Sequence, residues 1–167
     1  MAKIGIVYGS TTGNTQGVAK KIQDAFGVES ADLWAISDVS ADDLGKYQTL
    51  LLGSSTWGVG DLQDDWEDGI TKLDDLELSG KKVALFGTGD SQGYPDSFVD
   101  AIGILYEKVV EKGATVIGNC STDGYEYDAS KAVKDGQFVG LVIDEDNESD
   151  LTDERIAKWI EGLKAAM

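Results

Sequence analysis

The amino-acid sequence predicts an α/β protein in which helices cover both faces of a doubly wound parallel sheet. Short apolar runs flanked by glycine recur along the chain, and such runs are typical of strands that are buried on both faces. Segments in which apolar residues recur at helical spacing lie between these runs. Strand and helix therefore alternate. Because parallel strands need crossover connections, which helices provide, the alternation favours a parallel sheet.

The strands are expected where apolar residues run together. Before the last of these runs lies a polar stretch, residues 119–137, which contains glycine and tyrosine and interrupts the alternation. We interpret this stretch as an insertion that splits the last strand of the sheet. The expected strands are residues 4–8, 49–53, 83–87, 115–117 and 138–143.

The helices are expected in the segments between and after the strands. Gly113 follows Lys112 as a helix stop, and Thr152 precedes two acidic residues as a helix start. Trp66 and Trp159 fall on apolar helix faces and are expected in the core. The apolar faces consist of Val18, Ile22, Ala25 and Phe26; of Trp66, Ile70 and Leu73; of Phe98, Ala101, Ile102, Leu105 and Val109; and of Ile156, Trp159, Ile160 and Leu163.

Length and composition indicate one acidic domain over residues 1–167. Of the 167 residues, 41% are hydrophobic, which is enough to build a core. The formal charge of −17 repels phosphate backbones and anionic lipid, so neither nucleic acid nor a membrane is expected as a partner. With no histidine and a single cysteine, Cys120, we expect no metal site and no internal disulfide. Neither a signal peptide nor a membrane-spanning run is evident, and we expect a cytoplasmic protein.

The loop after the first strand has the composition of a phosphate site. Residues 9–15 read Gly-Ser-Thr-Thr-Gly-Asn-Thr and a helix begins there, so hydroxyl groups and free backbone N–H groups meet at a helix N-terminus. An ordinary helix cap is the alternative, but a cap needs one such residue and here several cluster. The loop lacks the lysine of a P-loop and the G-x-G-x-x-G of a dinucleotide site, which disfavours hydrolysis of nucleoside triphosphates. A terminal monophosphate fits this composition.

Two further loops each place an aromatic residue where no core pattern requires one. Trp57 lies in residues 54–61, after the strand expected at 49–53, and Tyr94 lies in residues 87–96, after the strand expected at 83–87. In open sheets of this class, ligands bind at the carboxyl ends of the strands. The two aromatic side chains are therefore expected to form a slot for a planar ring, while the phosphate loop holds its tail. For either residue alone, a loop side chain folded back on the surface is the alternative.

These loops resemble those of the flavodoxins, and the resemblance spans the whole chain. Residues 10–15 resemble the loop that holds the FMN phosphate, and residues 56–58 and residues 87–90 with 93–94 resemble the two loops around the isoalloxazine ring. The insertion and residues 141–147 are similar to the long-chain subgroup. The resemblance implies a five-stranded sheet in the order 2-1-3-4-5. It also implies that FMN is bound by Ser10, Thr11, Thr12, Gly13, Asn14, Thr15, Ser55, Thr56, Trp57, Gly58, Val59, Gly60, Thr88, Gly89, Asp90, Tyr94 and Asp146.

The same resemblance implies a small, low-potential electron carrier that has no catalytic residues and passes single electrons between redox enzymes. Its expected partners are the basic docking faces of redox proteins, such as a ferredoxin/flavodoxin-NADP reductase and low-potential acceptor oxidoreductases. We expect a monomer. Acidic residues gather at 61–68, 123–128 and 144–150, where they either steer such partners or form an ordinary solvated face.

Two other functions stay open at this point. A flavin-dependent quinone reductase of similar fold would need a nicotinamide pocket over the flavin, and aromatic side chains on both faces of the ring argue against such a pocket. An acidic interaction module without flavin would show no visible absorbance.

Overall fold

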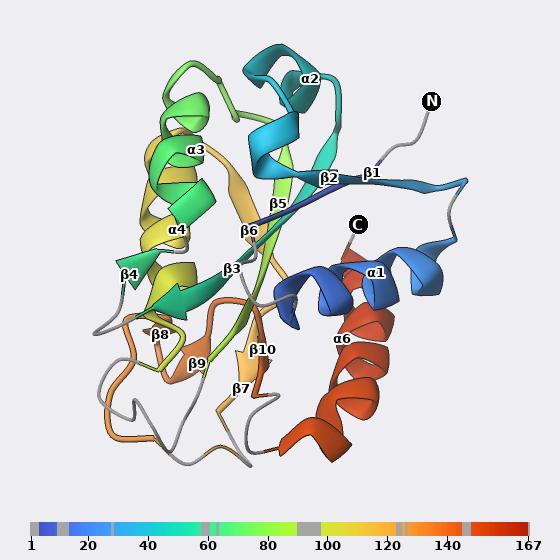
Figure 1. Cartoon of the computed structure of the whole chain (residues 1–167), viewed down its shortest axis with the longest axis vertical. Coiled ribbons are helices and arrows are strands. Elements are labelled where there is room, and N and C mark those ends of the chain that lie inside the picture. Colours follow the sequence, from blue (N-terminus) through green and yellow to red (C-terminus); the bar gives the residue numbers. More distant parts are fainter. Residues whose placement is uncertain are drawn as a thin grey trace.

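A parallel sheet lies at the centre of the fold, and helices cover both of its faces (Figure 1). The computed structural model describes residues 4–9, 14–27, 29–57, 61–62, 64–89, 98–122, 125, 127–144 and 148–166. The main strands are β1 (Ile4–Gly9), β2 (Ala31–Ala35), β3 (Thr49–Trp57), β5 (Lys82–Thr88) and β10 (Leu141–Ile143), and the covering helices are α1 (Asn14–Phe26), α3 (Asp64–Asp74), α4 (Asp100–Glu111) and α6 (Thr152–Ala166).

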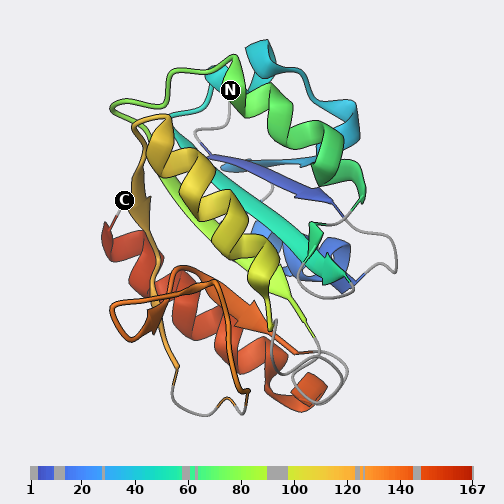
Figure 2. The ribbon, with the colours of Figure 1, turned by 90° about the vertical axis from the view of Figure 1, so that its left-hand side faces the viewer.

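The strands pair in the order β10-β5-β3-β1-β2, and each of these pairs is parallel. Helices α1 and α6 pack on one face, whereas α3 and α4 lie over the opposite face, toward the viewer in Figure 2. With β10 counted as the fifth strand, the predicted order 2-1-3-4-5 and the doubly wound class are confirmed. The chain changes its direction of winding between β1 and β3, and open sheets of this class bind ligands at that point.

Each face of the sheet has its own hydrophobic core. Leu51 of β3 packs in one core with Ile22 of α1 and Ile160 of α6, whereas its neighbour Leu52 packs in the other core with Trp66 of α3. All five side chains are buried. Successive residues of β3 therefore enter opposite cores, as the apolar run predicts. No helix within the described ranges is long and apolar enough to cross a bilayer.

Strand β2 and helix α2 (Ala41–Gly45) are among the elements that none of the expected ranges covers. Strand β2 lies at an edge of the sheet and only its first residue, Ala31, is buried, so it lacks the continuous apolar run of a central strand. Helix α2 begins with a capping box, in which the Ser40 hydroxyl accepts the Asp43 backbone N–H at 3.1 Å. That signal is present in the sequence, since serine precedes an acidic residue by three positions.

The last strand is split by an insertion, as predicted. Strand β6 (Thr115–Ile117) pairs with the first half of β5, and β10 pairs with the second half. Between them the chain leaves the main sheet and forms a small antiparallel sheet in the order β7-β9-β8. Its strands are β7 (Cys120–Ser121), β8 (Val133–Lys134) and β9 (Gln137–Phe138).

The single strand predicted at 138–143 is wrong in extent. Phe138 belongs to β9 of the small sheet, whereas β10 of the main sheet begins at Leu141. Gly140 lies between them, so close to β5 that a Cβ atom there would overlap the carbonyl oxygen of Leu85. The apolar run therefore divides at Gly140. The backbone there lies too close to β5 for any side chain, so only glycine fits.

Hydrogen bonds fasten the insertion to the start of α4. The backbone N–H of Phe98 donates to the carbonyl oxygen of Ala129 at 3.2 Å, and the Ser130 hydroxyl donates back to the carbonyl of Phe98. The backbone N–H of Lys131 donates to the buried carboxylate of Asp100 at 2.7 Å. Figure 2 shows the insertion, in orange, beside this end of α4. Because α4 follows residues 90–97, these contacts hold the chain directly after one of the predicted flavin loops.

Burial of Asp100 makes the stability of the fold depend on pH. Burial raises the pKa of the Asp100 carboxyl above its usual 3.8, against the hydrogen bond from Lys131, which lowers it. The folded state then holds the proton more tightly than the unfolded state, so ionisation removes stability as pH rises from 3.8 through the folded pKa. We expect the free energy of unfolding of Asp100→Asn, relative to the unchanged protein, to increase over this range and then to level off. Urea unfolding between about pH 4 and about pH 7 measures this difference.

Asp74→Asn is the matched control, because the pKa of the Asp74 carboxyl is shifted in the opposite direction from that of Asp100. The Lys108 ammonium donates a hydrogen bond to Asp74 at 2.6 Å and lowers the pKa of the Asp74 carboxyl. Ionised Asp74 therefore adds stability, so Asp74→Asn should lose stability relative to the unchanged protein as pH rises through the folded pKa to about 3.8, and the difference should stay level above that. Urea unfolding extended down to about pH 3 covers this range. Parallel curves for the two variants would contradict the assignment of Asp100 as a buried, destabilising carboxylate.

Candidate functional site

The carboxyl ends of β1, β3, β5 and β10 lie at one edge of the sheet, which we call the carboxyl edge. The parallel register places Gly9 beside Ser54, Ser55 beside Thr88, and Thr88 beside Ile143. Four segments that are far apart in the sequence therefore meet at this edge. Of the predicted site residues, the structure describes the backbone of Asn14, Thr15, Ser55, Thr56, Trp57, Thr88 and Gly89, and all of them lie at strand ends on this edge or in the helix that follows β1.

A buried hydrogen bond joins α1 to β5 at the carboxyl edge. The Oγ1 atoms of Thr15 and Thr88 are 2.9 Å apart, and both side chains are buried. Thr15 lies in the first turn of α1, which contains no acidic residue. The free N–H groups and the positive end of the helix dipole are therefore held against the sheet without a carboxylate of the helix to neutralise them. Such a helix end favours an anionic ligand such as a phosphate.

Ser55 places a second hydroxyl at the same edge. The side chain is buried, yet its Oγ has no hydrogen-bond partner among the described residues. The hydroxyl of Ser54, by contrast, donates to the carbonyl oxygen of Ser55 at 2.8 Å. Because Ser55 is in register with Thr88 on a parallel strand, both side chains point to the face that α1 covers. A buried hydroxyl without a partner costs about 1–3 kcal/mol, so its Oγ marks a place where a ligand can supply the missing hydrogen bond.

Close packing surrounds the residue that follows β5. The backbone N–H of Gly89 donates to the carbonyl oxygen of Ile143 at 3.1 Å. A Cβ atom at Gly89 would lie 2.9 Å from Cγ1 of Val99, the residue before α4. Val99 itself has φ 49°, a left-handed conformation that β-branched residues rarely adopt. No motif in the sequence signals this conformation, which the contacts around the start of α4 maintain.

Trp57 is the last residue of β3, so the prediction that a loop begins at residue 54 is wrong. Strand β3 continues past Gly53, and Trp57 pairs antiparallel with Asp61 of β4 (Asp61–Leu62). The backbone ladder with β4 holds this extension. Below it, the indole Nε1–H of Trp66 donates to the carbonyl oxygen of Gly53 at 2.6 Å and ties α3 to β3. The backbone that carries Trp57 is therefore anchored from two sides.

The remaining predicted site residues lie outside the described residues, and their roles stay predictions. The slot expected between Trp57 and Tyr94 also stays a prediction, because the structure describes neither side chain. The residues concerned are Ser10, Thr11, Thr12, Gly13, Gly58, Val59, Gly60, Asp90, Tyr94 and Asp146.

The described part of the carboxyl edge has the donor chemistry that FMN requires. Hydroxyl groups and the backbone N–H groups of a helix end suit a phosphate, and the buried hydroxyl of Ser55 suits a polar atom of a larger ligand. None of the predicted site residues is a lysine or an arginine. The site can therefore hold an anion by neutral donors, but it lacks the cations that phosphoryl transfer uses.

The chain is similar to flavodoxins along nearly its whole length. The sequence model of the flavodoxin family matches residues 6–159. A flavodoxin from a Nostoc species is 51% identical over 163 residues, which cover 98% of this chain and 96% of that protein. Flavodoxin 1 from Azotobacter vinelandii is 47% identical over 168 residues, which cover 98% of this chain and 97% of that protein.

Solved structures show the same similarity. The crystal structure of Fusobacterium nucleatum flavodoxin bound to flavin mononucleotide matches with a TM-score of 0.94 and 32% sequence identity, covering 100% of this chain and 99% of that chain. A flavodoxin 1 from Bacillus cereus matches with a TM-score of 0.73 and 30% identity, covering 98% of each chain. The chain therefore belongs to the flavodoxin family, and its insertion places it in the long-chain subgroup.

Proposed function

We propose that the chain is a small electron carrier that binds FMN without a covalent bond at the carboxyl edge. The observation that carries the proposal is the buried Ser55 hydroxyl, which has no partner among the described residues and lies where the winding of the sheet reverses. The relative from Fusobacterium nucleatum was crystallised with flavin mononucleotide. We take residues 1–167, with the insertion at about 119–137, to act as one FMN-binding domain.

The phosphate of FMN is proposed to lie at the N-terminus of α1, within the loop of residues 10–15. The bond between Thr15 and Thr88 supports this placement, because it holds the first turn of α1 on the sheet. Lys20 and Lys21 follow more than a turn later, and Lys21 pairs with Asp153 at 2.6 Å. Neutral hydroxyl and N–H donors would thus hold the phosphate, which suits permanent binding rather than chemistry on the phosphate.

The ring of FMN is proposed to lie along the ends of β3 and β5. Residues 55–60 and 88–90 would surround its edge, with Trp57 and Tyr94 on its two faces and Asp146 nearby. The parallel register of Ser55 with Thr88 supports this placement, because it brings the ends of the two strands side by side. The Ser55 hydroxyl would then find in the ligand the hydrogen-bond partner that it lacks among the described residues.

Bound FMN supplies a ring that accepts and releases single electrons. The chain contributes an electrostatic environment, because a net charge of −17 raises the free energy of any negative charge added at the carboxyl edge. Burial of the residues at this edge, such as Ser55 and Thr88, excludes water that would otherwise solvate that charge. Both effects favour a low reduction potential.

The proposed partners are basic docking faces of redox proteins, such as a ferredoxin/flavodoxin-NADP reductase and low-potential acceptor oxidoreductases. Exposed carboxylates of α3, Glu67 and Asp68, support this, because α3 begins just after β4 at the carboxyl edge. Complementary charge of this kind speeds encounter and gives weak, fast exchange. We propose that the protein acts as a cytoplasmic monomer, where its free thiol, Cys120, suits a reducing compartment.

Binding and reduction of FMN test the proposal directly. We expect the apoprotein to take up one equivalent of FMN with loss of flavin fluorescence, and dithionite titration to show reduction at potentials below those of free FMN. A colourless protein that leaves added FMN in solution would contradict the proposal. Steady turnover of NADPH with a quinone by the purified protein alone would instead identify a quinone reductase.

Ser55→Ala should separate ligand binding from stability. Removing a hydroxyl without a partner should leave the apoprotein at least as stable in urea, whereas FMN should bind about fivefold more weakly, because one hydrogen bond contributes about 1 kcal/mol. Fluorescence titration measures the affinity. Thr152→Val is the control, since the Thr152 hydroxyl is also buried without a partner among the described residues but lies at the start of α6. Equal affinity losses in the two variants would count against a contact between Ser55 and FMN.

Reduction by a basic reductase should slow as salt is added. Screening of the acidic carboxyl edge should lower the second-order rate constant about tenfold between roughly 50 mM and 500 mM salt. Stopped-flow kinetics measures it. The double variant Glu67→Gln with Asp68→Asn should lose part of this dependence. The control, Glu29→Gln with Glu111→Gln, removes two exposed carboxylates at the opposite edge of the sheet and should retain it. Rates that stay flat with salt in the unchanged protein would contradict electrostatic docking.

A further inference from the structure

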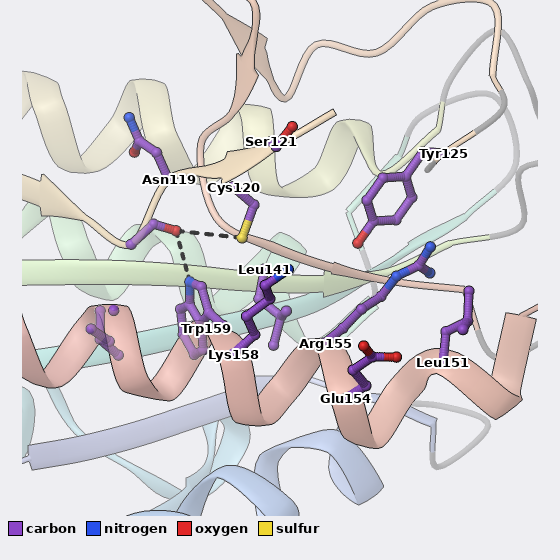
Figure 3. A pocket seen from close by; sticks show the side chains of 13 residues that line it. Asn119, Cys120, Ser121, Tyr125, Leu141, Leu151, Glu154, Arg155, Lys158 and Trp159 are labelled. Carbon is purple, nitrogen blue, oxygen red and sulfur yellow. Dashed lines mark hydrogen bonds between the residues drawn. The ribbon is translucent and has the colours of Figure 1, made fainter. Parts of the chain in front are cut away.

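A second candidate site lies between the insertion and α6, apart from the carboxyl edge. There the structure forms a cavity of about 530 Å³ that is open to solvent on one side (Figure 3). Its walls come from the chain that leaves β6, from the start of β10 and from one side of α6. None of the predicted flavin-binding residues lines it. Cavities of a few hundred Å³ with apolar walls and few polar groups are typical of sites for small molecules.

The cavity exists because the last strand is split. Strand β6 ends at Ile117 and β10 begins at Leu141, so the chain diverges from the main sheet between them. Gly118 makes the first step away, with φ 82°, and a Cβ atom there would lie 2.9 Å from Nε1 of Trp159. The indole Nε1–H of Trp159 donates to the carbonyl oxygen of Gly118 at 2.7 Å. This hydrogen bond holds α6 and the departing chain at a fixed separation, so the cavity is formed before any ligand enters.

The inner wall of the cavity is apolar. Leu141, Trp159 and Leu163 line it and are each at most 5% exposed. Cys120 lines it as well, and burial raises the pKa of its thiol to about 11. At neutral pH the thiol is therefore uncharged and belongs to the apolar wall rather than acting as a nucleophile. Because Leu141, Trp159 and Leu163 are almost fully covered, most of the apolar surface that a ring can remove from water belongs to the half-buried lining residues Cys120, Tyr125 and Leu151.

The rim of the cavity carries cations, although the chain as a whole is acidic. Arg155 and Lys158 project from α6 beside Glu154, in a chain of 14 basic and 31 acidic residues. The Arg155 guanidinium lies 4.0 Å from the centre of the Tyr125 ring and 3.2 Å from a carboxylate oxygen of Glu148, which fixes it at the rim (Figure 3). Lys158 is exposed and lies one helical turn further along, over the apolar wall. Because Glu148 already pairs with Arg155, Lys158 is the cation that an anionic group at the rim would meet.

We propose that this cavity binds a small, flat, apolar carboxylate, with its ring against the half-buried apolar lining of the cavity and its carboxylate at Lys158. The volume is ample for a ligand of one or two fused rings, the apolar lining favours the ring, and Lys158 favours the negative charge. The site is independent of the proposed binding of FMN, since the two sites share no residue. A ligand here would contact the insertion and α6 together and would resist their separation.

Binding of 2-naphthoate, with 2-naphthamide as its uncharged counterpart, tests the proposal. The protein is saturated with FMN, so that a flavin site, if present, is filled, and the probe is titrated while backbone amide resonances are recorded by NMR. We expect saturable shifts confined to residues 118–121 and 151–163, with a Kd of about 0.1–1 mM, the range for a ligand of this size. The amide probe should bind at least about fivefold more weakly.

Variants of α6 test the two halves of the site. Gly162→Phe should abolish binding, because a Cβ atom at this lining position meets no other atom within 4 Å and the ring can fill the cavity. Ala165→Phe, on the same helix but outside the lining, should bind normally. Lys158→Gln should weaken 2-naphthoate about fivefold and leave 2-naphthamide unchanged, whereas Lys164→Gln, which removes the same charge outside the lining, should change neither.

Several results would overturn the proposal. One is the absence of shifts at millimolar 2-naphthoate, and another is shifts confined to the carboxyl edge. Undiminished binding to Gly162→Phe would place the ligand elsewhere. Equal binding of the acid and the amide, or equal loss of both in Lys158→Gln, would remove the carboxylate from the proposal. Because the readout is the position of the shifts, failure here is distinct from failure to bind FMN.

Discussion

Parallel pairing of β3 with β1 on one side and β5 on the other is the constraint on which the site depends. It brings Gly9, Ser55 and Thr88, which belong to three distant parts of the chain, to a single edge. A shift of one residue in either pair would turn Ser55 or Thr88 away from α1 and break the contact between Thr88 and Thr15. The two buried cores hold this register, because each strand residue enters one core or the other.

The last strand of the sheet is split into two halves, β6 and β10, by the insertion. One half of that strand, β10, supports β5 where the carboxyl edge lies, and the other half, β6, supports the opposite end of β5. The insertion between them has its own small sheet, is fastened to the start of α4, and faces α6 across the cavity. The same interruption thus holds the chain next to a predicted flavin loop and leaves a cavity between the insertion and α6.

Much of this architecture follows from local patterns. Apolar runs identify β1, β3 and β5, and the clustering of hydroxyl residues and glycine at 10–15 identifies the helix end that a phosphate favours. The same pattern does not identify the edge strand β2, because only one of its residues is buried and it has no continuous apolar run. Residues 138–143 read as one strand in the sequence because the run is apolar throughout, although Phe138 belongs to β9 and residues 141–143 to β10, which lie in different sheets.

The residue pattern was enough to establish the fold class and, through the family resemblance, the strand order, and it predicts which loops hold the ligand, since these depend on periodicity and on residue types a few positions apart. Only the tertiary structure decided that Thr15 meets Thr88, that Ser55 is buried without a partner among the described residues, and that Val99 adopts a left-handed conformation. It also decided that a cavity opens beside Trp159. Such features depend on how segments separated by tens of residues pack together, and no local pattern encodes the distance between them.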